Sequence, residues 1–471
     1  MNIPCRFLLA LTITLGACAT PAPPAAIDLE GPIDFAARSL GDPRLKTYME
    51  TALRRQISAW PLTAWDEQDL TLAAFYYQPE LSTARARWAT AQAAEISAGG
   101  RPNPTLALLP EYNTDAPKNI SPWIVSVGLN LPIETAGKRR YRLARAQQLS
   151  AAARFDVAAT AWRIRSRVRA KLLDLYAGQR IHALLDKQLM LAGARRAAVE
   201  QRLAAGAASR PEAAQAAAAV QQIQLAQRQS EQQELADRSG LAQSLGVSVA
   251  ALQGIEFSFA AFADTPGRIE LLALEARQRG LSGRAELLAA LADYAASESA
   301  LQLALAGRIP NLEIGPGYKW DEGAVKWSVG VALTLPISQA GPIAEAAAQR
   351  DHAAARFNSL QAKAIGEIDQ ASAAYQLALH QLDAAATLSA TAEQQMQATE
   401  EQLRAGEADR LALLEARLQG VLSEQTRLAA AINAHRSVGA LEDALQQPLA
   451  PVPLPVPYHD PRSIAQHGLA E

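Results

Sequence analysis

The chain has 471 residues, a length that allows two or three ordinary domains or one elongated structure. Its formal net charge at pH 7 is −2, so the overall charge gives no support for a nucleic-acid partner. Alanine, leucine, glutamine, arginine and glutamate dominate from about residue 136 onward, and aromatic residues make up only 5% of the chain. This composition is typical of long helices and excludes a compact, aromatic-rich core over most of the chain.

The first residues predict an export signal at 1–17, because a short basic start is followed by an apolar run too short to span a bilayer permanently. The run ends in Leu15-Gly-Ala-Cys18, which resembles the bacterial lipobox and implies cleavage before Cys18 and acylation of its sulfur, for example with palmitate. The alternative is a plain signal peptide with Cys18 incidental. Residues 18–42 then predict a flexible, lipid-anchored tether. Ala19, rather than Asp, favours the outer membrane.

Two helical segments follow the tether. The first is expected from Pro43 to Trp60, with Asp42 as its N-cap and Pro43 at a position where no amide donor is missed. The second begins near Trp65, has carboxylates in its first turn, and is expected to run to about Ser97.

Two β-hairpins are expected, at about 104–133 and 310–336, because the period of apolar residues changes from helical to alternating. Between Trp123 and Leu131, and again between Trp327 and Leu335, apolar residues alternate with small or polar ones. Pro110 weakens the first strand of the first hairpin.

Each expected strand has the length, about nine to eleven residues, that a tilted strand needs to cross a bilayer. Trp123, Trp320 and Trp327 lie near the loop ends of the hairpins, where lipid-facing aromatic residues of a membrane interface would be found. Four strands cannot close a barrel, and an open sheet in lipid would leave its edges unsatisfied. Membrane hairpins therefore require several chains to share one barrel. The alternative is two soluble hairpins of a β-sandwich.

Long helical hairpins follow each β-hairpin, at about 137–246 and 339–447. The first is free of proline from Lys138 until Pro211, which allows a helix of about 100 Å at 1.5 Å per residue. Gly206 and Gly406 are the natural turns, because glycine accepts a positive φ without steric cost. Helices of this length cannot share one globular core, so they predict a rod, a bundle or a tunnel.

The two halves are copies of one another. Leu131-Pro-Ile-Glu-Thr-Ala-Gly recurs as Leu335-Pro-Ile-Ser-Gln-Ala-Gly, and Ala151-Ala-Ala-Arg-Phe recurs as Ala353-Ala-Ala-Arg-Phe. A repeat of about 200 residues is too long for a solenoid unit and indicates an internal duplication. We therefore expect a first repeat at 43–246 and a second repeat at 281–447, separated by an inter-repeat segment at 247–280 with a short helix at about 268–278. An extended or disordered Pro-rich tail is expected at 448–471.

No group of residues predicts enzymatic chemistry, a cofactor or a metal site. The six histidines are scattered, without other ligands at metal-site spacing. Arg139, Arg140, Arg142 and Arg145 form a basic run that we interpret as a solvated helix face near a membrane surface rather than as a specific anion site.

Taken together, these runs resemble the TolC-like outer membrane factors, and among them the heavy-metal-efflux (CzcC-like) subgroup. The resemblance is carried by Leu131-Pro-Ile-Glu-Thr-Ala-Gly-Lys-Arg139, by Trp65 through Trp88, and by Ile309-Pro-Asn-Leu-Glu-Ile-Gly-Pro-Gly-Tyr318. It implies a mainly α fold with a membrane β-barrel. Three chains would share one twelve-stranded barrel, continuous with an α-helical periplasmic tunnel. Ser126, Asn130, Ser328 and Thr334 would face the water-filled lumen.

The resemblance also implies two kinds of site at the tips of the helical hairpins. A periplasmic membrane-fusion adaptor would dock at the two tips, whose residues are Leu203, Gly206, Ser209, Leu403, Gly406 and Asp409. Glu415 would stand at the tunnel aperture, where a ring of carboxylates would favour cations. The second acidic position of the family is Ala412 here, and a solvated surface glutamate is the alternative for Glu415.

The resulting expectation is a lipid-anchored homotrimer in the outer membrane that extends into the periplasm. It would act as a passive exit duct for an adaptor and an inner-membrane transporter, and the subgroup implies that this transporter is of the proton-driven RND type. Metal cations are the first cargo expected from the subgroup, and drugs or other small organic molecules are the alternative. A tunnel for type I protein secretion is a further alternative with the same fold.

Overall fold

The structure, a computed structural model, describes residues 32–267, 273–321 and 323–449. It comprises two units, which are described separately. The first ends at Arg38 and contains helix α2 (Pro32–Ala37), and the second begins at Ser39. The signal sequence, Cys18, and most of the expected tether and Pro-rich tail lie outside the described residues.

Helix α3 (Pro43–Leu53) begins as the sequence predicts. The Asp42 side chain accepts a hydrogen bond from the backbone N–H of Arg44, and Pro43 occupies the first turn. The expected end at Trp60 is wrong, because Arg54 adopts a left-handed conformation with φ 51° and stops the helix. The Glu50 side chain then accepts a hydrogen bond from the N–H of Ile57 and holds the chain after the turn.

The expected continuous helix from Trp65 to Ser97 is also wrong, because it is broken into α4 (Glu67–Tyr77) and α5 (Pro79–Gly99). The break has a local cause. Pro79 disfavours a helical conformation in the residue before it, and Gln78 is extended with φ −72° and ψ 118°. Pro79 then takes the first position of α5, where its missing N–H costs nothing.

The two hairpins join into one antiparallel sheet. Its strands are β1 (Thr105–Tyr112), β2 (Trp123–Ile133), β3 (Leu312–Asp321) and β4 (Ala324–Leu333), in the order β1-β2-β3-β4. The pairing of β2 with β3 connects the two repeats, and β1 and β4 form the edges. Pro110 lies within β1, which is tolerated because β1 is an edge strand of this chain.

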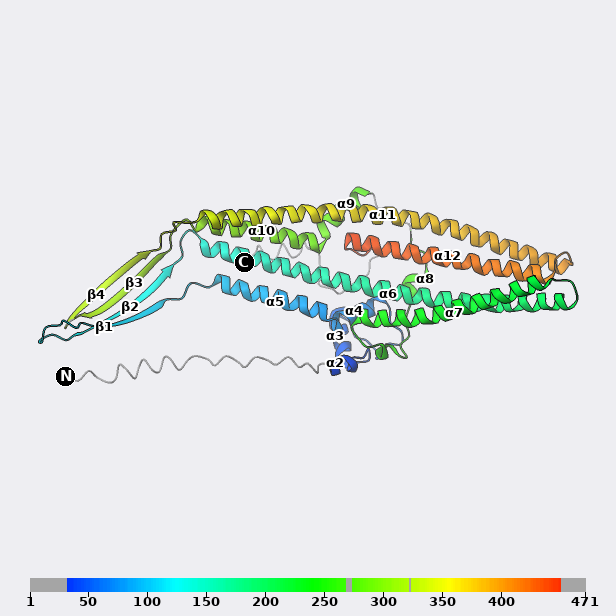
Figure 1. The fold of residues 1–471 in the computed structure, drawn as a ribbon, viewed down its shortest axis with the longest axis horizontal. Coiled ribbons are helices and arrows are strands. Elements are labelled where there is room, and N and C mark those ends of the chain that lie inside the picture. The colour runs from blue at the N-terminus through cyan, green and yellow to red at the C-terminus, as the bar shows by residue number, and fades with distance from the viewer. Residues whose placement is uncertain (1–31, 268–272, 322, 450–471) are drawn as a thin grey trace. The chain divides into compact units, whose positions relative to one another are not determined.

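Four long helices make up most of the second unit (Figure 1). They are α6 (Lys138–Ala204), α7 (Arg210–Leu245), α11 (Ala340–Ala405) and α12 (Arg410–Leu445). Helix α6 has 67 residues and is therefore about 100 Å long at 1.5 Å per residue. The sheet lies at one end of these helices, and the turns of the two helical hairpins lie at the other.

The inter-repeat segment contains short helices: η1 (Val249–Leu252), α8 (Ala260–Ala263) and α9 (Ala273–Gly283). The helix expected at about 268–278 ends later, at Gly283, and residues 268–272 are outside the described chain. Helix α10 (Ala285–Ala306) then leads back to the sheet.

The buried apolar residues gather where the short helices meet the middle of the long ones. One cluster joins α4, α6 and the end of α7, and includes Trp65, Leu70 and Leu172. A second, smaller cluster joins α9, α11 and the end of α12, and includes Ile368, Tyr375 and Leu441. Each repeat therefore buries its own apolar cluster at the same level of the helices.

The predicted fold class is confirmed: the chain is mainly helical and repeats the order strand, strand, long helical hairpin. Of the helices described between residues 32 and 449, none combines the length and apolar character that a membrane-spanning helix requires.

Candidate functional site

The sheet has one face made only of apolar side chains. Directly paired residues lie on the same face, so the register places Trp123 beside Tyr112, Trp327 beside Tyr318, and Trp320 between Val125 and Val325. The three tryptophans predicted to face lipid therefore share one face. The members of this apolar face are Leu106, Leu108, Pro110, Tyr112, Trp123, Val125, Val127, Leu129, Leu131, Ile133, Leu312, Ile314, Pro316, Tyr318, Trp320, Val325, Trp327, Val329, Val331 and Leu333.

The apolar face is largely uncovered within one chain. Trp327 is 79% exposed and Val329 is 76% exposed. A continuous apolar surface of this extent on a sheet is not expected to face water, so it indicates contact with lipid or with another protein.

The opposite face is mostly small or polar and contains Ser126, Asn130 and Ser328, as predicted for residues facing a lumen. The Asn130 amide donates a hydrogen bond of 2.7 Å to Glu313. Glycines occupy its centre, and a Cβ atom added to Gly317 would lie 2.6 Å from the Ser328 Oγ. The face also holds Gly128, Gly315, Lys319, Lys326 and Gly330.

The basic run after β2 fastens the sheet to the helices. Arg139 and Arg142 donate hydrogen bonds to the last carbonyls of α5, at Gly99, Ala98 and Gly100, and Arg142 also pairs with Glu134. Lys138 donates to the carbonyl of Ile309 at 2.6 Å. Arg139, Arg140 and Arg145 are exposed, in agreement with a solvated face, but the interpretation is wrong for the half-buried Arg142, which satisfies carbonyls that a helix end leaves unpaired.

The two helical hairpins turn with the same geometry. Gly206 has φ 72° and Gly406 has φ 81°, a conformation in which a side chain would be strained. The Ser209 side chain accepts a hydrogen bond from the N–H of Glu212 in a capping box, and Asp409 accepts one from the N–H of Ala412. Of the predicted docking residues, Leu203 and Leu403 are half-buried and the other four are exposed.

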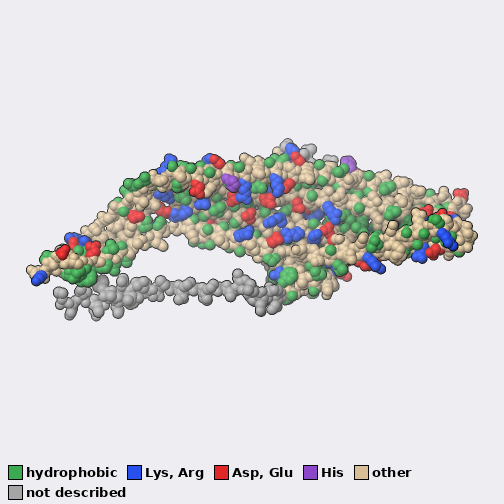
Figure 2. All heavy atoms as spheres, viewed as in Figure 1, with side chains coloured by type: hydrophobic (Ala, Val, Ile, Leu, Met, Phe, Trp, Pro, Cys, Tyr) green, Lys and Arg blue, Asp and Glu red, His purple; other side chains and the backbone are tan. Residues whose placement is uncertain are grey.

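A row of ion pairs joins α6 to α12 between the tips and the middle of the helices. At the tip, Arg202 lies 2.8 Å from Asp409, and two turns away Arg195 lies 3.2 Å from Glu415. The other two pairs in this row are Lys187 with Glu424 and Asp174 with Arg436. Figure 2 shows basic and acidic side chains intermingled along the helices and at the tips. The candidate aperture residue Glu415 is thus an ion-pair partner of Arg195.

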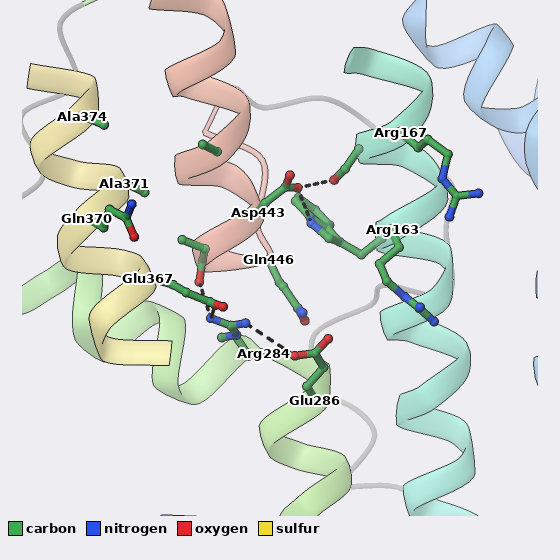
Figure 3. Close-up of a pocket in the computed structure, with 14 residues that line it drawn as sticks. Arg163, Arg167, Arg284, Glu286, Glu367, Gln370, Ala371, Ala374, Asp443 and Gln446 are labelled. Atoms are coloured by element: carbon green, nitrogen blue, oxygen red, sulfur yellow. Dashed lines mark hydrogen bonds and ion pairs between the residues drawn. The ribbon is translucent and has the colours of Figure 1, made fainter. Parts of the chain in front are cut away.

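A cavity of about 650 Å³ lies where α12 ends against the start of α10, between α6 and α11 (Figure 3). Arg284 connects the helices there: its guanidinium donates to Glu367 at 2.7 Å and to the carbonyl of Ala444, and it also faces Glu286. The Gln446 side chain accepts a hydrogen bond from the N–H of Ala285, the first residue of α10. Arg284, just before α10, therefore caps the end of α12, and Gln446, just after α12, caps the start of α10.

The first repeat has the same junction. The Gln78 amide donates hydrogen bonds of 2.7 Å to the carbonyls of Gln243 and Ser244 at the end of α7. Sequence reasoning missed both junctions. The available signal was the similarity of Gln78-Pro-Glu-Leu81 to Arg284-Ala-Glu-Leu287, which places a long polar residue immediately before each helix.

A buried charge cluster joins α4, α6 and α12 in the middle of the molecule. Arg165 is 2% exposed, and its guanidinium lies 3.1 Å from Glu442 and 3.3 Å from Glu67. Arg169 completes the cluster at 3.6 Å from both carboxylates, and the Arg165 guanidinium lies over the Trp162 ring. Burial raises the pKa of Glu67, and the two arginines oppose this effect.

The pH dependence of stability is expected to reflect Asp69 at the start of α4. Burial, and then the charge of Asp66, raise the pKa of Asp69 to about 6 from 3.8. The folded protein therefore keeps a proton that the unfolded chain loses, and the stability contributed by this group falls as the pH rises from about 4 to about 6.

Asp69→Asn removes the charge and is expected to raise the midpoint of thermal unfolding at about pH 7.5, and to raise it much less at about pH 4. Circular dichroism of the purified protein across this pH range measures both midpoints. An equal effect at both pH values would show that the change acts through packing rather than through the proton.

Within the described ranges, no group of three or more histidine, cysteine, aspartate or glutamate side chains is arranged to hold a metal ion. What the site offers is a sheet with two different faces, long helices with charged side chains, and two matching tips.

Comparison with known proteins gives one family and several solved structures. Residues 276–446 match the family described as Outer membrane efflux protein. No curated protein sequence is similar enough to this chain to count as a match.

The solved structures share the fold at low sequence identity. The outer membrane protein VceC of Vibrio cholerae is 20% identical, with a TM-score of 0.66 over 82% of this chain and 97% of VceC. CusC is 16% identical, with a TM-score of 0.66 over 83% of this chain and 94% of CusC. The CmeC outer membrane channel of Campylobacter jejuni is 16% identical, with a TM-score of 0.63 over 80% of this chain and 85% of CmeC.

Proposed function

We propose that this chain is the outer-membrane exit duct of a tripartite efflux system, because residues 276–446 match the Outer membrane efflux protein family. The expectation that the protein is not an enzyme is confirmed by the family. The proposal rests chiefly on the sheet, which is apolar on one face, small or polar on the other, and unpaired at both edges within the chain.

Such a sheet is stable in a membrane only when it closes on itself, because unpaired backbone groups are costly in lipid. Three copies of a four-stranded sheet make a twelve-stranded barrel, with β1 of one copy paired to β4 of the next. The apolar face, including Trp123, Trp320 and Trp327, would then contact lipid, and the face with Ser126, Asn130 and Ser328 would line a watery lumen. The helices continue the lumen as a periplasmic tunnel.

The remaining parts of the proposal follow the sequence expectations. The tips would dock a periplasmic adaptor, an inner-membrane transporter of the proton-driven RND type would supply the energy, and acylation of Cys18 would anchor each copy to the outer membrane. The likeness of both turns supports a repeated docking element, since Gly206 and Gly406 give the two tips the same backbone.

The cargo proposed first is metal cations, from the resemblance to the CzcC-like subgroup. The structure adds no support for cation selectivity at Glu415, because Arg195 compensates its charge. Drugs and other small organic molecules are the second candidate, since a passive duct conducts whatever its pump delivers. Protein secretion through the same fold is the third.

The experiment is growth of a deletion strain on divalent metals, dyes and antibiotics, with the wild-type gene restored as the control. Sensitivity confined to metals supports the first cargo, and sensitivity to organic compounds alone replaces it with the second. A deletion strain that is sensitive to nothing favours protein secretion, and absence of the wild-type protein from the outer membrane fraction contradicts the duct.

A further inference from the structure

The two helical hairpins correspond residue by residue near their tips. Helices α7 and α12 both have 36 residues, Arg210–Leu245 and Arg410–Leu445, and both are capped by the residue before them. Counted from the tips, residue 209 of the first repeat therefore corresponds to residue 409 of the second, and residue 202 to residue 402. Any contact made by one hairpin can be compared with the equivalent position on the other.

Within one chain the helices near the tips lie in the order α7, α6, α12, α11 (Figure 1). Helix α6 contacts α7 on one side and α12 on the other, and we call this α6–α12 contact the internal seam. Helices α7 and α11 lie at the two edges. In the duplication, α11 is the equivalent of α6 and α7 is the equivalent of α12. The sides of α11 and α7 that are equivalent to the two sides of the internal seam therefore lie at the outside of the chain.

Apolar residues at these edges are exposed where their equivalents are buried. Leu235 of α7 is 70% exposed, whereas its equivalent His435 in α12 is 5% exposed. Leu388 of α11 is 48% exposed, whereas its equivalent Gln188 in α6 is 6% exposed. The duplication therefore gives the chain two outer edges, on α7 and α11, that are equivalent to the two sides of the internal seam.

The chemistry of the edges nevertheless differs from that of the internal seam. Arg202 and Asp409, which pair at the tip of the internal seam, correspond to Gln402 and Ser209. The next pair, Arg195 with Glu415, corresponds to Gln395 and Gln215. On α7, the equivalents of Glu424 and Arg436 are Gln224 and Ala236.

We propose that α11 of one copy packs against α7 of the next copy in the register of the internal seam, and that this copy-to-copy seam is uncharged where the internal seam is ion-paired. A contact of this kind joins two different surfaces, so it closes into a ring when the rotation between copies allows it. The proposal rests on the proposed assembly of several chains into one duct. Gln402 then lies beside Ser209 of the next copy, as Arg202 lies beside Asp409 within a copy.

A consequence is that the two seams respond differently to salt. Ion pairs between partly exposed side chains weaken as ionic strength rises, whereas apolar and amide contacts depend on it much less. Salt is therefore expected to loosen each α11–α12 hairpin from its own α6–α7 hairpin while the contact between copies persists.

The register is tested by disulfide formation in the full-length protein. The variant Ser209→Cys with Gln402→Cys is expected to give covalent dimers and trimers on oxidation, and each single variant is expected to give none of these. The matched control, Arg202→Cys with Asp409→Cys, is expected to lose its free thiols without any increase in mass, because that pair lies within one chain. Both double variants lose one N-cap residue, so they are equally perturbed at the turn.

The chemistry is tested by giving the copy-to-copy seam the missing ion pair. Ser209→Asp with Gln402→Arg keeps an N-cap side chain and is expected to raise the temperature at which the assembly dissociates in detergent. Neither single variant should give this gain, and high salt should remove it. A gain of the same size in either single variant would overturn the proposed pairing.

Native mass measurements separate this inference from the proposed function. A wild-type protein that remains a single chain in detergent would contradict the duct itself. An assembled protein whose 209/402 cysteine pair cross-links only within one chain, or not at all, would contradict the register alone. An assembled and cross-linked protein without any efflux phenotype would contradict the function and leave the seam in place.

Discussion

Replacing Arg165 with alanine is expected to lower the free energy of unfolding by about 3–5 kcal/mol. The Arg165 guanidinium lies 3.1 Å from Glu442, a residue that is 3% exposed, and 3.3 Å from Glu67. Without Arg165, the Glu442 carboxylate stays buried with only Arg169, at 3.6 Å, as a compensating charge. An unpaired buried charge cannot recover the hydration it lost on folding.

The matched control is Arg167→Ala, two residues along the same helix. Arg167 pairs with Glu80 at 3.0 Å, but both side chains are more than a third exposed, so the expected loss is about 0–1 kcal/mol. Thermal unfolding in detergent, followed by circular dichroism, compares the two variants. Equal midpoints for both variants would mean that water or Arg169 satisfies the carboxylates, and that the cluster does not hold the three helices together.

A lysine in place of Val329 is expected to prevent the protein from accumulating in the outer membrane, whereas a lysine in place of its neighbour Ser328 is expected to be tolerated. Val329 lies in the middle of β4 on the apolar face, and Ser328 lies at the same depth on the small and polar face. In a lipid-facing position near the bilayer centre, a lysine costs about 2–4 kcal/mol, and a trimer would contain three.

The Ser328 variant has space for the longer side chain, since Ser328 is paired with Gly317, which has no side chain of its own. The polar face already carries Lys319 and Lys326. Immunodetection in outer membrane fractions, with total cell protein as the reference, measures the difference. If both variants reach the membrane in equal amounts, the sheet faces are not lipid and lumen as proposed.

The sequence predicted the fold class because the features that define it are local and repeated. A change of apolar period from 3.6 to 2 residues marks the hairpins, the absence of proline after Lys138 permits a very long helix, and the duplicated tips place Gly206 and Gly406 at the turns. Capping is also local, which explains why Asp42 and its following proline were identified correctly.

Where the sequence predictions failed, contacts between distant parts of the chain decided the outcome. The sequence does not identify Pro79 as a helix break, because both flanking segments are helical. The role of Gln78 depends on the end of α7, which lies far along the sequence. The basic run after β2 was interpreted as solvated, since nothing in the sequence shows that the ends of α5 and α10 lie beside it.

The sequence alone determined that this protein is duplicated, mainly helical and provided with two alternating hairpins, because periodicity and repetition are properties of the chain itself. Only the tertiary structure decided which charges are paired. Arg165, Arg167 and Arg195 look alike in the sequence, yet one is buried between two carboxylates, one is on an exposed pair, and one compensates Glu415. The energy of a charge depends on its burial and on its partners, and both are set when helices far apart in the sequence pack together.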